Sequence, residues 1–203
     1  IRYKQYVRGL IYLLTQIGFF CFLKNFALQY LSKFTTLGME TQRKVWNEDL
    51  QIYQRFPGDN SMLILLYSVL SLAVIAVFLY IWYANIRDSW HAQENLREGR
   101  KIASFRDDLH SLTNERFHIT LLSMPMLTLV LFTLLPIIFM ILIAFTNFDA
   151  DHQPPGNLFT WVGMTNVTDI FLGNAIKTNT FFGLLGWTIV WAILATFTNY
   201  ILG

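Results

Sequence analysis

The side chains in this sequence that could do chemistry are few, and they are scattered. The acidic pair Asp107-Asp108 would supply two carboxylates for acid–base work. Neighbouring residues on a helix point about 100° apart, so the pair is interpreted as part of a solvated face. The four histidines lie in polar segments and are interpreted as solvated or interfacial residues rather than metal ligands; they are His91, His110, His118 and His152.

Two further candidates, Cys21 and Lys24, lie within an apolar stretch near the amino terminus. A single cysteine forms no internal disulfide and no multi-cysteine metal site, so Cys21 is interpreted as a small hydrophobic residue. An ionisable residue inside a membrane span is by default a functional candidate. Lys24 lies near the end of its stretch, however, where a long side chain reaches the lipid headgroups.

Motifs for phosphate binding and hydrolysis are absent from the sequence. It contains no G-x-x-x-x-G-K-[ST] loop, no G-x-S-x-G and no H-E-x-x-H. The net charge of +2 and the lack of a long run of basic residues argue against a nucleic-acid partner. We therefore predict a protein that is not an enzyme, with no catalytic residue, no metal and no cofactor.

The element that dominates the chain is residues 119–145, an apolar run without any charged side chain. A helix needs roughly 20 apolar residues to cross the bilayer core, and a soluble core helix of this length would have a polar face. Pro125 and Pro136 lie inside the run and are expected to kink it, which neighbouring membrane helices tolerate. With 54% hydrophobic and 14% charged residues overall, the sequence indicates an integral membrane protein.

Four such segments occur along the chain, and they predict an all-α, polytopic membrane protein with about four transmembrane helices. The last segment is still apolar at Gly203, so the sequence is expected to be part of a longer protein. The segments are residues 9–31, 62–82, 119–145 and 181–203.

The distribution of Lys and Arg predicts how the spans are oriented. Three basic residues precede the first span and six lie between the second and third, against four and one in the other two loops. Basic residues are enriched in cytoplasmic loops. We therefore expect a cytoplasmic amino terminus, with loop two (residues 85–118) in the cytoplasm and loops one (32–61) and three (147–179) outside.

The loops also have local patterns. In loop one, apolar residues near helical spacing predict a short amphipathic helix on the outer surface, closed by a turn at residues 57–60. The residues of that pattern are Val45, Ile52 and Phe56 together with Trp46, Leu50 and Tyr53.

In loop two, Ser104 and Asp107 have the spacing of a capping box, and Phe105, Leu109 and Leu112 follow on one helical face. Loop three contains Pro154-Pro155-Gly156 and then an aromatic stretch. It predicts an irregular segment followed by a helical turn. Asn147 is interpreted, together with Asp149, as a stop signal for the third helix.

Several ordered stretches resemble the maltose/maltodextrin-type (MalF-like) permease subunit of bacterial carbohydrate ABC importers. They include GDNSMLILLY at 58–67, the loop at 95–125, LLPIIFMILIAFTNFDADHQPPGNLFTWVGMTN at 134–166 and the apolar stretch 181–203. Within them, WVGMTN at 161–166 is similar to an element that precedes the permease core in many sugar importers.

The resemblance implies a subunit of an ATP-driven sugar importer in the bacterial plasma membrane, forming part of the translocation pathway. Its partners would be a second permease subunit, ATP-binding subunits, an extracellular sugar-binding protein and the lipid bilayer. It carries no substrate-binding residue over to this chain, because the family's main sugar-contacting spans and its ATPase-docking loop come later.

This interpretation divides the chain into an amino-terminal two-span hairpin with its cytoplasmic loop (1–117), a third span with its outer loop (118–179) and the start of a permease core (180–203). The alternative is a small four-span structural or regulatory membrane subunit that is complete as it stands.

Overall fold

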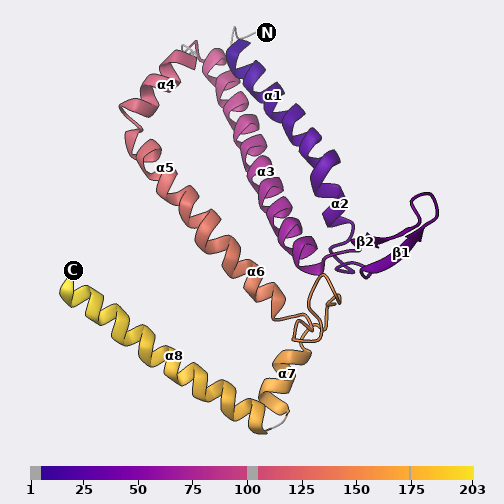
Figure 1. The fold of residues 1–203 in the computed structure, drawn as a ribbon. Coiled ribbons are helices and arrows are strands. Elements are labelled where there is room, and N and C mark those ends of the chain that lie inside the picture. Colours follow the sequence, from indigo (N-terminus) through magenta and orange to yellow (C-terminus); the bar gives the residue numbers. More distant parts are fainter. Residues whose placement is uncertain (1–5, 100–104, 174) are drawn as a thin grey trace.

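The computed structural model describes residues 6–99, 105–173 and 175–203. Within these ranges, four helices are long and apolar enough to cross a membrane, which confirms the four spans expected from the sequence. They are Tyr6–Leu31, Ser61–Arg97, Phe117–Ile143 and Ala175–Leu202. The protein is thus an all-α, multi-pass membrane protein (Figure 1).

The first span is one continuous rod that changes its winding once. It consists of α1 (Tyr6–Phe22), the π-helical turn η1 (Leu23–Ala27) and α2 (Leu28–Leu31). It lies antiparallel to the second span, α3 (Ser61–Arg97) (Figure 1).

Aromatic rings and a side-chain hydrogen bond join these two spans along their length. Phe19 of α1 stacks on Phe78 of α3 with ring centroids 3.6 Å apart, and Tyr30 packs against Tyr67 at 4.8 Å. Ser68 Oγ donates a hydrogen bond to the carbonyl oxygen of Tyr30 at 3.1 Å. A hydroxyl that bonds across two helices lets them approach closely, as small polar residues do in membrane interiors.

The third span contains both prolines and changes its winding between them. It comprises α5 (Phe117–Leu129), the π-helical turn η2 (Val130–Leu134) and α6 (Leu135–Ile143). Pro136 is the second residue of α6, just after η2. In a regular α-helix its ring would clash with the carbonyl group four residues earlier, and a wider π-helical turn relieves that contact. The irregularity of this span thus lies between the two prolines, and Pro125 itself lies within the α-helical segment α5.

The fourth span is set apart from the others. α7 (Thr165–Leu172) follows the connecting segment 144–164 and leads into α8 (Ala175–Leu202), which contacts α7 and contains no buried residue. In Figure 1, α8 points away from the first two spans. The helical turn expected in loop three is confirmed as α7.

Loop one differs from its prediction. It forms a β-hairpin, with strand β1 (Arg43–Asn47) antiparallel to β2 (Ile52–Phe56), so the expected amphipathic helix is wrong. The apolar residues that seemed to share one helical face belong to two separate strands. The turn expected at residues 57–60 is not formed either: these residues are an irregular connection into α3, in which Gly58 has a φ of +64°.

The physical reason for the hairpin lies in its connecting turn. Asn47 Oδ1 accepts hydrogen bonds from the backbone N–H groups of Asp49 at 3.0 Å and Leu50 at 3.2 Å, and Gln51 has a φ of +50°. An Asn side chain that bonds to the backbone two residues ahead favours a turn over a helix. Trp46 then pairs across the strands with Tyr53, a cross-strand aromatic pair typical of sheets.

Loop two is largely helical. α3 continues to Arg97, well past residue 82 where its apolar part was expected to end, and α4 (Phe105–Thr113) confirms the helix predicted there. Ser104, the proposed first residue of the capping box, lies outside the described residues. So do four of the basic residues used for the orientation: Arg2, Lys4, Arg100 and Lys101.

Candidate functional site

A buried hydrophobic cluster lies where segment 144–164 packs onto the ends of the first three spans. Its core is Phe159, which is fully buried against Leu37, Ile64 and Leu65. Phe148 packs edge-to-face on Phe159 with ring centroids 5.4 Å apart. We call this cluster, together with Trp161 and Asn166, the helix-end junction.

Ser61, the first residue of α3, holds Phe159 in place. Its fully buried Oγ accepts a hydrogen bond from the backbone N–H of Phe159 at 3.3 Å. Asn60, which precedes the helix, accepts from the backbone N–H of Leu63 at 3.1 Å and so caps α3. The sequence Asn-Ser thus begins the helix and also binds the segment that covers it.

Trp161 connects the junction to the first span. Its indole Nε1 donates a hydrogen bond to the carbonyl oxygen of Phe34 at 2.9 Å, and the two rings meet edge-to-face at 5.5 Å. Trp161 also pairs with Thr146 as an isolated antiparallel bridge. One side chain therefore joins the segment after α2 to the segment after α6, although they are far apart in sequence.

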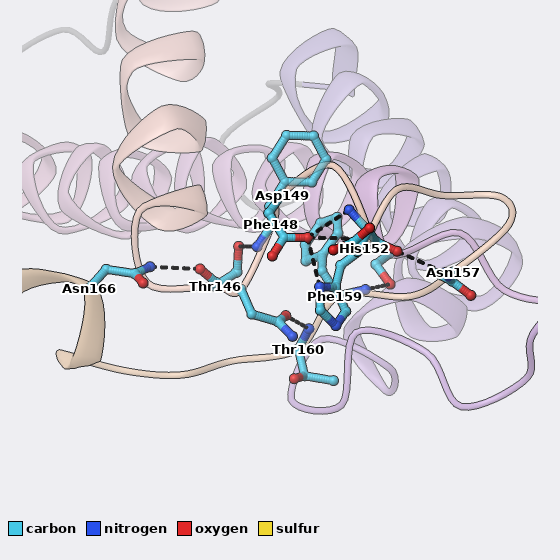
Figure 2. Close-up of polar contacts among 11 residues, drawn as sticks. Thr146, Phe148, Asp149, His152, Asn157, Phe159, Thr160 and Asn166 are labelled. Carbon is cyan, nitrogen blue, oxygen red and sulfur yellow. Dashed lines mark hydrogen bonds and ion pairs between the residues drawn. The ribbon is translucent and has the colours of Figure 1, made fainter. Parts of the chain in front are cut away.

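Gly163 and Asn166 close the junction on the side of α7. Gly163 has a φ of +62°, and a Cβ there would meet no atom within 4 Å, so glycine is favoured by conformation rather than space. Asn166 Nδ2 donates to the carbonyl oxygen of Ala144 at 2.9 Å. It also donates to the carbonyl oxygen of Thr146 at 2.8 Å (Figure 2). These carbonyl groups follow the last turn of α6, which has no further helical partners for them.

The rest of the connecting segment is held by its own polar side chains (Figure 2). Asn147 Oδ1 accepts from the backbone N–H of Thr160 at 2.6 Å, and Asp149 accepts from the ring of His152 at 2.7 Å. The hydrogen bonds from His152 hold the pKa of Asp149 below its ordinary value. α6 ends at Ile143, before the chain reaches Asn147 and Asp149. These two side chains therefore order the loop and do not themselves end the helix.

Asp59 organises the approach to α3. Its carboxylate pairs with Lys33 Nζ at 2.5 Å and accepts from the backbone N–H groups of Met39 at 3.0 Å and Glu40 at 3.3 Å. Burial by itself would raise the pKa of Asp59, but these three hydrogen bonds outweigh it and lower the pKa. The contact draws the base of the hairpin onto the end of the first span.

Hollows of different character lie along the spans. An apolar groove of about 420 Å³ runs between α3 and the third span, with Tyr67, Phe132, Pro136 and Phe139 among its lining residues. A polar cavity of about 190 Å³ lies at the opposite end from the junction. It is lined by residues of α1, α3 and α4 and by Arg116, including Arg8, Asn85 and Asp88.

The side chains singled out from the sequence are not brought together. Lys24 and Cys21 are exposed on the first span, and His110 of α4 lies beside Asn114, the residue that follows this helix. His91 lies 3.9 Å from Glu94, and His118 is exposed near the start of α5. Among the described residues, no three metal-binding side chains form a group.

Three junction residues belong to the sequence pattern WVGMTN (161–166), which by itself predicts no structural role for them. Trp161, Gly163 and Asn166 each have a distinct one here: a hydrogen bond to the first span, a left-handed turn and a cap on α6. The signal that points to them is a Trp, a Gly and an Asn close together after an irregular segment. What the arrangement does is hold three spans at fixed positions.

Comparison with known proteins identifies relatives for the whole chain. It is 27% identical over 200 residues to the galactooligosaccharides transport system permease protein GanP of Bacillus subtilis, covering 98% of this chain and 44% of GanP. It is 30% identical over 203 residues to the maltodextrin transport system permease protein MdxF of the same organism, covering 98% and 42%. The maltodextrin permease MalC of Streptococcus pneumoniae is 29% identical over 201 residues, with the same two coverages.

The chain is a relative of carbohydrate ABC transport permeases. The resemblance expected from the sequence is therefore confirmed, and the chain spans less than half the length of the curated relatives it matches. No protein-family model and no solved structure matches it. The helix-end junction contains WVGMTN (161–166), the sequence element that had suggested this relationship to permeases.

Proposed function

We propose that this chain is part of the permease subunit of an ATP-driven oligosaccharide importer and contributes part of its translocation pathway. The observation that carries the proposal is similarity over 98% of the chain to permeases named for maltodextrin and galactooligosaccharide transport. Four apolar helices of membrane-spanning length support it. On this proposal the chain helps to form the path of the sugar across the membrane, and other subunits hydrolyse ATP.

The partners follow from that role. They are a second permease subunit, ATP-binding subunits and an extracellular sugar-binding protein. Support comes from α8, an apolar helix of 28 residues whose main contact is with α7 and which has no buried residue. Small and hydroxyl side chains such as Gly186, Ala192 and Thr196 occur along it, and such residues let membrane helices pack closely.

The proposed orientation places the amino terminus and loop two in the cytoplasm and the helix-end junction outside. Its support is the excess of Lys and Arg on the amino-terminal side. We also retain the division into a two-span hairpin (1–117), a third span with its loop (118–179) and the start of a core (180–203). The exposed α8 favours counting the last part separately.

The function is tested by disrupting the gene in its host and measuring the uptake of radiolabelled sugars. We expect uptake of maltodextrin or of galactooligosaccharide to fall to background while glucose uptake is unchanged. Expression of the intact gene from a plasmid should restore uptake. Unchanged uptake of both oligosaccharides would contradict the proposal.

The orientation is tested with a reagent that reacts with thiols and does not cross membranes. In a Cys21→Ser background, a cysteine at Gln153 should react in intact cells, and a cysteine at Glu115 should react only after lysis. Both side chains are exposed in the structure, so accessibility within the protein is matched. The reverse pattern would invert the orientation without affecting the uptake test.

A further inference from the structure

The β1–β2 hairpin takes no part in the helix-end junction core. Figure 1 shows it projecting sideways from the end of the first two spans, across the direction of the helices. It lies between the end of α2 at Leu31 and the start of α3 at Ser61. Because both helices cross the membrane, a ribbon that leaves sideways at their ends runs along the layer of lipid headgroups.

The strand register divides the hairpin into two faces. Residues directly opposite each other point to the same side, so Lys44 and Arg55 share a face with Trp46 and Tyr53. We call this the cationic–aromatic face. The other face contains Arg43, whose guanidinium lies 5.3 Å from the ring centroid of Phe56.

The cationic–aromatic face contains a pair that is unfavourable in isolation. Lys44 and Arg55 are directly opposite, and like charges at such positions destabilise a sheet. Neither forms an ion pair with any described residue; Arg55 donates only to the neutral Gln42, at 2.7 Å. The two acidic residues of this segment, Glu48 and Asp49, lie in the turn. An anion from outside the hairpin would remove the repulsion.

The aromatic residues beside this pair fit the same environment. Trp46 and Tyr53 are 48% and 69% exposed, and their rings meet at 4.9 Å. Tyr and Trp are enriched at the headgroup level of membranes because each combines an apolar ring with a polar tip. Two cations favour an anionic surface over a neutral sugar, and the aromatic rings favour a lipid surface over bulk water.

We propose that the cationic–aromatic face of the β1–β2 hairpin binds anionic phospholipid headgroups at the end of the first two spans. Lys44 and Arg55 bind the phosphate groups, and Trp46 and Tyr53 enter the headgroup layer. The hairpin thereby fixes the first two spans to the membrane surface from the side. This role is separate from transport and would exist in any membrane protein with such a hairpin.

The test uses the chain reconstituted in vesicles of phosphatidylcholine alone or of phosphatidylcholine and phosphatidylglycerol in equal parts. In a Cys21→Ser background, a fluorophore is attached to a cysteine at Tyr53 or at Gln54, which neighbour each other but point to opposite faces. A lipid with a spin label on its headgroup quenches fluorophores near the surface. We expect strong quenching at position 53 in vesicles with phosphatidylglycerol and weak quenching at 54.

The charge dependence is tested with K44Q and R55Q combined, against R43Q on the opposite face as the matched control. One cation near an anionic surface changes occupancy roughly fivefold, so the double substitution should abolish most of the quenching at 53, and R43Q should leave it intact. Hydrogen exchange of residues 43–56 with Tyr53 intact should slow on adding phosphatidylglycerol to the vesicles. Soluble glycerol phosphate at matched ionic strength should not slow it.

Three results would overturn the proposal. Equal quenching at 53 and 54 would show that neither face is preferred. Equal quenching with and without phosphatidylglycerol would exclude recognition of charge. Protection of the hairpin only when other membrane proteins of the host are added would assign the face to an acidic protein partner instead.

Discussion

The helix-end junction and α8 are two apolar regions of one chain with opposite surroundings. In the junction, Phe159 is fully buried and its backbone N–H is bound by Ser61. In α8, Trp187 and Phe197 are 61% and 62% exposed, and no residue of the helix is buried. The core of the junction is buried within this chain, whereas α8 is exposed along its length.

The difference shows which part of the fold is fixed by the chain itself. The junction joins residues from three spans through side chains that bond to backbone groups, such as Trp161 to Phe34 and Asn166 to Ala144. Bonds of this kind orient helices, whereas apolar contact between helices in lipid gives little preference for one position. We therefore expect removal of a junction side chain to destabilise the isolated chain, and removal of an exposed α8 side chain to matter only in an assembly.

The largest effect is expected from Phe159→Ala. Removing a fully buried aromatic side chain costs about 3–5 kcal/mol, because the cavity left behind closes only in part. Hydrogen exchange of segment 144–164 in detergent should accelerate accordingly. Phe197→Ala on α8 removes an equal side chain from an exposed position and should leave this exchange unchanged. Equal effects of the two substitutions would contradict the comparison.

The next largest effect is expected from Asn166→Leu, which removes both hydrogen bonds to the carbonyl groups beyond α6. Thr146 is buried, and leaving its carbonyl group without a donor costs about 1–3 kcal/mol, whereas the carbonyl group of the exposed Ala144 can bond to water. Protection of residues 143–147 against exchange should fall, with α5 little changed. Asn199→Leu on α8 is the matched control, since it makes the same substitution on an exposed helix. A loss of protection with this control would argue against a local cap.

A smaller effect, of opposite sign in the two regions, is expected from glycine substitutions. Gly163→Ala forces a side chain into the left-handed region, which costs about 1–2 kcal/mol. Gly186→Ala lies within α8 with nothing within 4 Å of a new Cβ, and alanine there should stabilise the helix by up to about 1 kcal/mol. Thermal unfolding followed by circular dichroism in detergent measures both. A stabilising Gly163→Ala would contradict the assigned role of this turn.

The spans could be predicted from the sequence because a charge-free run of membrane length has few alternatives. The hairpin could not, since Val45, Ile52 and Phe56 fit a helical period as well as two strands, and only the Asn47 turn decides between them. The junction depends on contacts such as Trp161 to Phe34, separated by 127 positions. No local pattern encodes a partner at that distance, so the WVGMTN pattern indicated a family but not the bonds its residues make.

The smallest effect is expected from pH. Asp59 has a pKa lowered below its ordinary value of 3.8, because its bonds to Lys33, Met39 and Glu40 outweigh the effect of burial. A carboxylate with a lowered folded pKa stabilises the fold at pH values above the unfolded pKa, and this stabilisation is lost as the pH falls through the folded pKa. Exchange of residues 33–40 should therefore be constant from neutral pH down to about pH 5 and rise relative to intrinsic rates below about pH 4. Asp59→Asn should remove that rise.

α8 contains no acidic residue, so its relative exchange should not change over the same range. A parallel rise in α8 would point to global acid unfolding instead of the loss of this one contact.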